Sequence, residues 1–162
     1  MNDAKKDIES YSVKTAQLWK AESCNLLKKY KDDKAGFREI LHSVVGKSSG
    51  VLRNIKKDDF ASFAEYVRKN FSKIESGKFD IFSVENFSGK KPTSFVSKIC
   101  HIVNPKDYPL IWDENVRKAL QIGTRRKEWQ SKVEEFKSKQ IGKKGEELYK
   151  IDSELWSQGA SL

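Results

Sequence analysis

Residues 91–120, KPTSFVSKICHIVNPKDYPLIWDENVRKAL, predict two helices joined by a tight loop. The apolar residues of the first helix recur at helical spacing and give it one apolar face, formed by Phe95, Ile99, Ile102 and Val103. The loop carries a dense run of apolar residues, Tyr108, Pro109, Leu110, Ile111 and Trp112. This stretch therefore predicts a helical pair around a buried loop, and we expect the rest of the fold to be built around it.

Short polar residues and a proline set the ends of these two helices. The hydroxyl of Thr93 or Ser94 can accept from the unpaired N–H groups of a first helical turn, so we expect one of them to cap the first helix. The Asn104-Pro105 pair ends this helix, because proline disfavours helical geometry in the residue before it. Asp113 is placed to cap the second helix, over residues 114–120.

Helical periodicity also fills the rest of the chain. We expect helices over residues 3–31 with a break near Ser12, from Asp32 or Asp33 to Gly46, from Asp58 to Gly77, from Thr124 to Gln140 and from Glu146 to Trp156. The connector over residues 79–87 is apolar and irregular, with room for one helical turn. Few stretches alternate with period two, and none is bounded like a hairpin. The sequence predicts an all-α, compact, multi-helix single domain over residues 1–162.

Length and composition narrow the class of protein. A chain of 162 residues can bury a core of its own. It lacks a run of about 18 apolar residues, so we expect no membrane span, and MNDAKKDIESYS at the N-terminus lacks the apolar segment of a signal peptide. Cys24 and Cys100 lie among apolar residues and fit reduced core thiols better than a disulfide. A cytoplasmic location is the expectation.

The net charge of +9 favours an anionic partner, and nucleic acid is the commonest one. The alternative is a lysine-rich surface without a dedicated partner. The four tryptophans are more often packing anchors than stacking platforms for bases.

One group of residues in the central stretch could carry chemistry: Lys98, His101 and Asp113. Desolvation on an apolar helix lowers the pKa of a lysine, and a free amine can form a Schiff base. A nearby carboxylate can stabilise a developing positive charge on a sugar. The alternative is that Lys98 lies on a solvated face and Asp113 only caps a helix. The chain has no phosphate-binding glycine loop, CxxC pair or HExxH motif, so we expect no metal and no cofactor.

The central stretch also resembles a known family. Its pattern is Ser94, Ser97-Lys98, Cys100-His101, Asn104-Pro105, Tyr108-Pro109 and Asp113, followed by Val116-Arg117-Lys118. This is similar to SxxSKxLHFxxPxxFPIxD in small bacterial proteins of the 8-oxoguanine DNA glycosylase fold, which is a helix-hairpin-helix DNA glycosylase-like fold. KIDSELWSQG, at residues 150–159, resembles the closing helix of that group. The resemblance covers about residues 87–159.

The resemblance implies a DNA-repair enzyme that excises a base. Asp113 matches the catalytic carboxylate of the family by position. The Schiff-base lysine of bifunctional members falls on Ser94 in an ungapped count, and Lys98 lies one turn further along the same helix. The family's hairpin has two glycines that grip a phosphate, whereas NFSGKKPTS offers only Gly89 with two lysines beside it.

The partner implied by the resemblance is duplex DNA, held through its backbone without regard to sequence. The phosphate-binding candidates are Lys90, Lys91, Arg117, Lys118, Arg125, Arg126 and Lys127. A base flipped out of the duplex would enter an aromatic pocket, for which the candidates are Tyr108 and Trp112, with Phe79 and Phe82 beside them. Two alternatives remain: a non-catalytic DNA-binding module, and a helical protein-interaction domain, for example one associated with phage defence or mobile elements.

Overall fold

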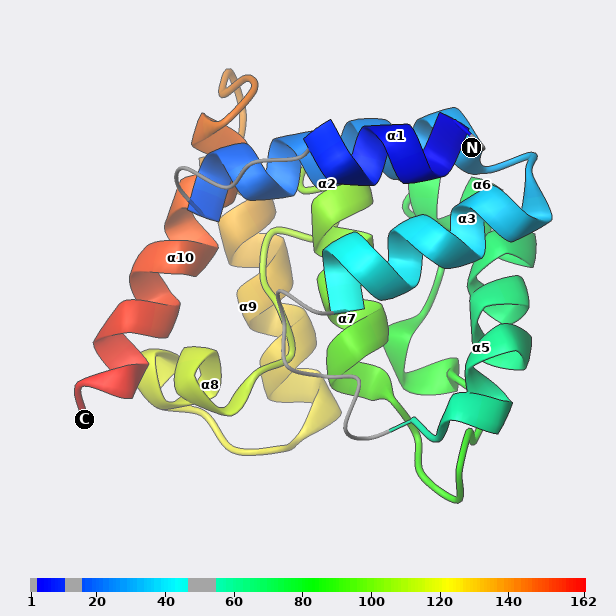
Figure 1. Cartoon of the computed structure of the whole chain (residues 1–162). Coiled ribbons are helices and arrows are strands. Elements are labelled where there is room, and N and C mark those ends of the chain that lie inside the picture. The colour runs from blue at the N-terminus through cyan, green and yellow to red at the C-terminus, as the bar shows by residue number, and fades with distance from the viewer. Residues whose placement is uncertain (1–2, 11–15, 47–54) are drawn as a thin grey trace.

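Helices account for most of the described residues, 3–10, 16–46 and 55–162, in the computed structural model (Figure 1). The α-helices are α1 (Asp3–Ser10), α2 (Ala16–Tyr30), α3 (Lys34–Ile40), α5 (Lys57–Lys69), α6 (Phe71–Glu75), α7 (Thr93–Val103), α8 (Glu114–Leu120), α9 (Arg126–Lys139) and α10 (Glu147–Ala160). A π-helical turn, Leu41–Gly46, extends α3, and a 3₁₀ turn, Ile81–Ser83, lies in the expected connector. These ranges contain no strand, and the all-α prediction is confirmed.

Helix α7 lies at the centre of the molecule (Figure 1). It packs against α2, α6 and the 3₁₀ turn, and all its residues are buried except Thr93, Ser94 and Lys98. The burial extends well beyond the single apolar face that the spacing predicts, because other elements cover α7 on several sides. Lys98 is therefore the one lysine, arginine or carboxylate side chain on α7, and from Phe95 onward every other residue of this helix is buried.

The caps of the central helices are only partly as predicted. Asp113 caps α8, since its Oδ1 accepts from the backbone N–H of Asn115 at 2.8 Å. The expected hydroxyl cap of α7 is wrong: the N-cap is Pro92, whose carbonyl accepts from the N–H of Val96, and no side chain caps this helix. The prediction that Thr124 caps α9 is also wrong, because the N-cap position, which has an extended backbone, is occupied by Arg125.

Other expected boundaries shift for local reasons. The long helix expected over residues 58–77 is interrupted at Asn70, whose side chain donates to the carbonyl of Tyr66 at 2.8 Å and separates α5 from α6. The expected cap at Asp33 is found, with its carboxylate accepting from the N–H of Gly36. The break expected near Ser12 falls outside the described residues.

A tight turn precedes α7 and was not predicted. Phe87 and Lys90 exchange two backbone hydrogen bonds, of 2.7 and 3.1 Å, around Ser88 and Gly89. Both central residues have left-handed backbones, with φ of 54° and 75°. Ser88 thus occupies a conformation that glycine usually fills. Its hydroxyl donates to the carboxylate of Asp59 at 2.6 Å, which ties the turn to the start of α5.

Two further predictions concern the core and membranes. Cys24 and Cys100 are buried free thiols, as the sequence indicated. Within the described ranges, no helix has the length and apolar character needed to cross a bilayer.

Candidate functional site

The amine of Lys98 points from α7 towards α2. Its Nζ lies 5.2 Å from the centre of the Trp19 ring, and the side chain is partly buried. Burial lowers the pKa of Lys98, and the positive charge of Lys20 lowers it further, while the carboxylates of Asp152 and Asp113 act in the opposite direction. Of the two alternatives for Lys98, a partly buried lysine and one on a solvated face, the structure shows the partly buried one.

Asp113 stands at the junction between the buried loop and α8. One carboxylate oxygen, Oδ1, caps the helix through Asn115. Among the described residues, no hydrogen bond engages the other oxygen, Oδ2. The carboxylate is partly exposed and close enough to Lys98 to influence its protonation. Asp113 can therefore act as a cap and still present one oxygen to a ligand.

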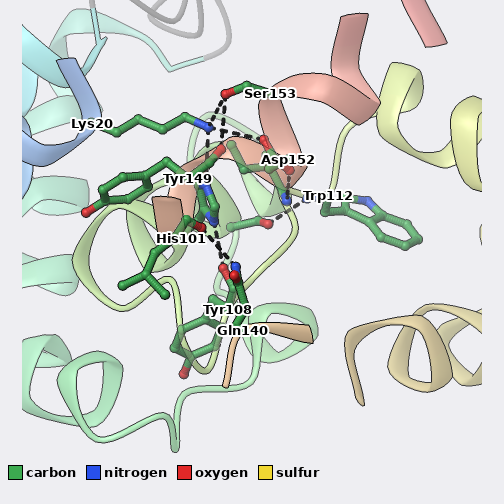
Figure 2. Close-up of polar contacts among 11 residues, drawn as sticks. Lys20, His101, Tyr108, Trp112, Gln140, Tyr149, Asp152 and Ser153 are labelled. Atoms are coloured by element: carbon green, nitrogen blue, oxygen red, sulfur yellow. Dashed lines mark hydrogen bonds and ion pairs between the residues drawn. The ribbon is translucent and has the colours of Figure 1, made fainter. Parts of the chain in front are cut away.

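His101 is fully buried, with 0% of its surface exposed, and its ring has polar contacts on both sides (Figure 2). Its Nδ1 lies 2.7 Å from the carbonyl oxygen of Tyr108, which can only accept, so Nδ1 carries the proton. Its Nε2 lies 3.1 Å from Nζ of Lys20 and accepts from it. Burial, with the neighbouring charges of Lys20 and Lys98, holds the pKa of His101 well below its usual value. This neutral ring links α7 to the loop.

Lys20 and Asp152 form a buried ion pair that sequence reasoning missed. They are only 4% and 2% exposed, and Nζ of Lys20 lies 3.3 Å from Asp152 Oδ2 and 3.3 Å from Ser153 Oγ. Burial lowers the pKa of Lys20 and raises that of Asp152, and their mutual attraction opposes both effects. One feature of the sequence could have indicated this pair: each residue stands next to an apolar residue in a predicted helix. Lys20 directly follows Trp19, and Asp152 directly follows Ile151.

This network fixes the loop that leads to Asp113. The N–H of Ile111 donates to Asp152 Oδ1 at 2.7 Å, and the N–H of Trp112 donates to Ser97 Oγ at 2.7 Å. Together with the His101 contact to the Tyr108 carbonyl, these bonds attach the loop to α7 and α10 (Figure 2). The backbone just before Asp113 is thus held by buried polar side chains.

The aromatic candidates lie around a cleft between α9 and the connector before α7. This cleft, of about 330 Å³, is lined by Phe79, Phe82, Tyr108 and Trp129, with Arg126 at its edge. The hydroxyl of Tyr108 donates to the carbonyl of Phe79 and accepts from its N–H, at 2.8 and 2.9 Å. Tyr108 is therefore pinned to the connector, and its ring forms a fixed wall of the cleft.

Trp112 belongs to a neighbouring cluster of rings. Its ring meets Phe82 and Trp129 edge to face, each with 5.0 Å between ring centres. The guanidinium of Arg117 lies 4.3 Å above the Trp112 ring. Trp112 does not line the cleft, but it contacts two residues that do, Phe82 and Trp129. Of the two residues predicted to form a base pocket, Tyr108 therefore lines the cleft and Trp112 lies next to it.

The predicted phosphate-binding residues differ in their pairing. Lys118 pairs with Glu114 at 3.0 Å, and Arg126 pairs with Asp80. Within the described ranges, the remaining candidates have no ion pair: Lys90, Lys91, Arg117, Arg125 and Lys127. The turn that carries Lys90 and the loop between α8 and α9 lie at the same end of the molecule (Figure 1). Cations are thus left available at that end.

No group of three or more histidine, cysteine or carboxylate residues in the described ranges is arranged to hold a metal ion. Comparisons of the chain with protein-family models, curated protein sequences and solved structures found no significant match. The resemblance to helix-hairpin-helix DNA glycosylases therefore stays a prediction.

Proposed function

We propose that this protein binds DNA and excises a base at a centre formed by Lys98 and Asp113. The observation that carries the proposal is the partly buried amine of Lys98, which lies 5.2 Å from the centre of the Trp19 ring. It is near enough to the Asp113 carboxylate to be affected by its charge, and one oxygen of that carboxylate has no hydrogen bond to the described residues. No ion pair or hydrogen bond to a described residue engages the amine of Lys98, which lies over the Trp19 ring. It is therefore available to a substrate.

The proposed reaction begins with a nucleotide flipped out of the duplex. The free amine of Lys98 forms a bond to the sugar C1′, the bond from C1′ to the base breaks, and the base leaves with the bonding electrons and then takes up a proton. Asp113 stabilises the positive charge that develops on the sugar. Loss of a proton from nitrogen and opening of the sugar ring give an imine, which water hydrolyses to release Lys98.

The basic end of the molecule supports DNA as the partner. A cation without an acidic partner breaks no ion pair when it contacts a phosphate, and each such contact releases counterions from the DNA. The Arg117 guanidinium, which lies over the Trp112 ring, provides a planar group on which an unpaired base can stack, since unpaired bases stack on guanidinium planes as well as on aromatic rings.

Borohydride trapping on duplex DNA that contains 8-oxoguanine or an abasic site tests the proposal. We expect wild-type protein to form a covalent adduct and Lys98→Ala to form none. The matched control is Lys144→Ala, which removes an exposed lysine from the loop before α10, away from the proposed DNA-binding end. An adduct that persists in Lys98→Ala contradicts the role of this amine.

A non-catalytic DNA-binding module is the second candidate, and one observation favours it: Asp113 already has a structural task as the cap of α8. This candidate predicts salt-sensitive DNA binding without an adduct. A protein-interaction domain predicts neither.

A further inference from the structure

We infer that Lys20 is a positioning residue of the Lys98–Asp113 centre. Its buried ammonium joins α2, α7 and α10, braces the loop before Asp113 and places a positive charge near the reactive amine. The inference rests on the proposed function for the part that Lys98 plays in catalysis. The arrangement of charges that it describes is tested without DNA.

The first step is the placement of two lysines in one layer between α2 and α7. Lys98 and His101 are three residues apart on α7, so they share a face. That face meets neighbouring residues of α2, because Lys98 lies against the Trp19 ring and His101 accepts from Lys20. The two amines therefore approach the same region from opposite helices.

The second step is the difference between these amines. An ammonium has three N–H donors, and Lys20 has three acceptors within reach: His101 Nε2 at 3.1 Å, Asp152 Oδ2 at 3.3 Å and Ser153 Oγ at 3.3 Å. Its three donors are satisfied by side chains of α7 and α10. Lys98 has no such partner among the described residues. The buried lysine is a fixed charge, and the partly exposed one is free to react.

The third step is the balance of charge around Lys98. Lys20 approaches from α2, Asp152 from α10 and Asp113 from the loop, while His101 on α7 is neutral. Burial and the charge of Lys20 lower the pKa of Lys98, and the two carboxylates raise it. Lys20 is thus the charged neighbour that favours the uncharged, nucleophilic amine.

The fourth step is the contact between Lys20 and the loop. Through His101 it reaches the carbonyl of Tyr108, and through Asp152 it reaches the N–H of Ile111. Both contacts lie within the few residues before Asp113. The same ammonium therefore influences the two groups of the proposed centre, one by charge and one by position.

The pH dependence of lysine acetylation tests this arrangement. Trace acetic anhydride is added from neutral to strongly alkaline pH, and acetylation of the peptide that contains Lys98 is followed by mass spectrometry. The reference is the same chain unfolded in guanidinium. We expect the midpoint for Lys98 in folded protein to lie below that reference, to rise towards it in Lys20→Gln and Lys20→Met, and to fall further in Asp113→Asn.

Loss of packing alone does not predict shifts of opposite sign in these variants, and circular dichroism checks that each one folds. An unchanged Lys98 midpoint in folded Lys20→Gln overturns the inference. If neither Lys20 variant folds, wild type and Asp113→Asn still decide. A Lys98 midpoint equal to that of the unfolded chain, or one that Asp113→Asn leaves unchanged, overturns the inference, and a low midpoint that falls further in Asp113→Asn supports the arrangement of charges. A low midpoint without any DNA adduct keeps the charge arrangement and rejects the proposed base excision.

Discussion

At the scale of single residues, Asp113 combines a structural task with a proposed chemical one. Its Oδ1 caps α8, and its Oδ2 has no hydrogen bond to the described residues. Asparagine caps helices about as well as aspartate, but it carries no charge. The two tasks can therefore be separated by a single substitution.

We predict that Asp113→Asn keeps the stability of the protein and loses base excision. Asp113→Ala should lose both, with a stability cost of about 1 kcal/mol for the missing cap. Thermal melting and base release from duplex DNA are the two measurements. Base excision at the wild-type rate in Asp113→Asn would show that the carboxylate is only a cap.

Lys98 is expected to lower the stability of the fold that carries it. Since its pKa is lowered on folding, the unfolded chain binds more protons at pH values between that lowered pKa and the ordinary lysine value of 10.5. The contribution of Lys98 to stability therefore rises with pH through this window and is least favourable below it.

We predict that Lys98→Met melts at a higher temperature than wild type at neutral pH, because no charge has to be desolvated. The difference between the two proteins should narrow as pH rises. Melting curves across neutral and alkaline pH give the comparison. A lower melting temperature for Lys98→Met at neutral pH contradicts a desolvated amine.

At the scale of elements, α8 and α10 meet at Gly159. A Cβ at this position would lie 1.7 Å from the backbone carbonyl oxygen of Asn115, so one of the two helices would have to move. Because Asn115 follows the start of α8, the site that Asp113 occupies depends on this close approach.

We predict that Gly159→Ala destabilises the protein by about 1–3 kcal/mol, the usual range for overpacking, and weakens base excision by displacing α8. Gly123→Ala is the matched control, since a Cβ there would meet nothing within 4 Å. Chemical denaturation measures both. Equal stability of the two variants would contradict the tight contact.

The elements also show what the sequence could and could not predict. Residues 114–120 and their Asp113 cap are local features, set by side chains within a few positions, and both were predicted correctly. The ion pair of Lys20 and Asp152 joins residues 132 positions apart, and no local pattern indicates such a partner. The left-handed Ser88 was missed because turns of this kind usually carry glycine. The sequence could thus predict the parts of the site that depend on neighbouring residues, but it could not predict the buried ion pair that holds the loop before Asp113.

At the scale of the whole molecule, the net charge of +9 is expected to favour binding to an anionic partner. Lys90, Arg125 and Lys127, which form no ion pair with the described residues, belong to the turn before α7 and to the segment where α9 begins. These segments lie at one end of the molecule, and the loop before α10 lies at the opposite end (Figure 1). Lys143 and Lys144 in that far loop provide an internal comparison.

We predict that the double variant Arg125→Glu with Lys127→Glu weakens DNA binding and reduces the slope of log affinity against log salt by about 2, one for each lost phosphate contact. Lys143→Glu with Lys144→Glu changes the net charge by the same amount and should retain the wild-type slope. Binding titrations over a salt series test this. Equal losses in the two variants would point to net charge alone.

The most direct test of the central claim is the identity of the residue that DNA captures. Borohydride-treated complexes with abasic DNA are digested, and the peptide that carries the sugar remnant is sequenced by mass spectrometry. The account predicts that the remnant lies on Lys98. A remnant on another amine, or no adduct under conditions where the protein binds the DNA, would contradict a base-excision centre at Lys98 and Asp113.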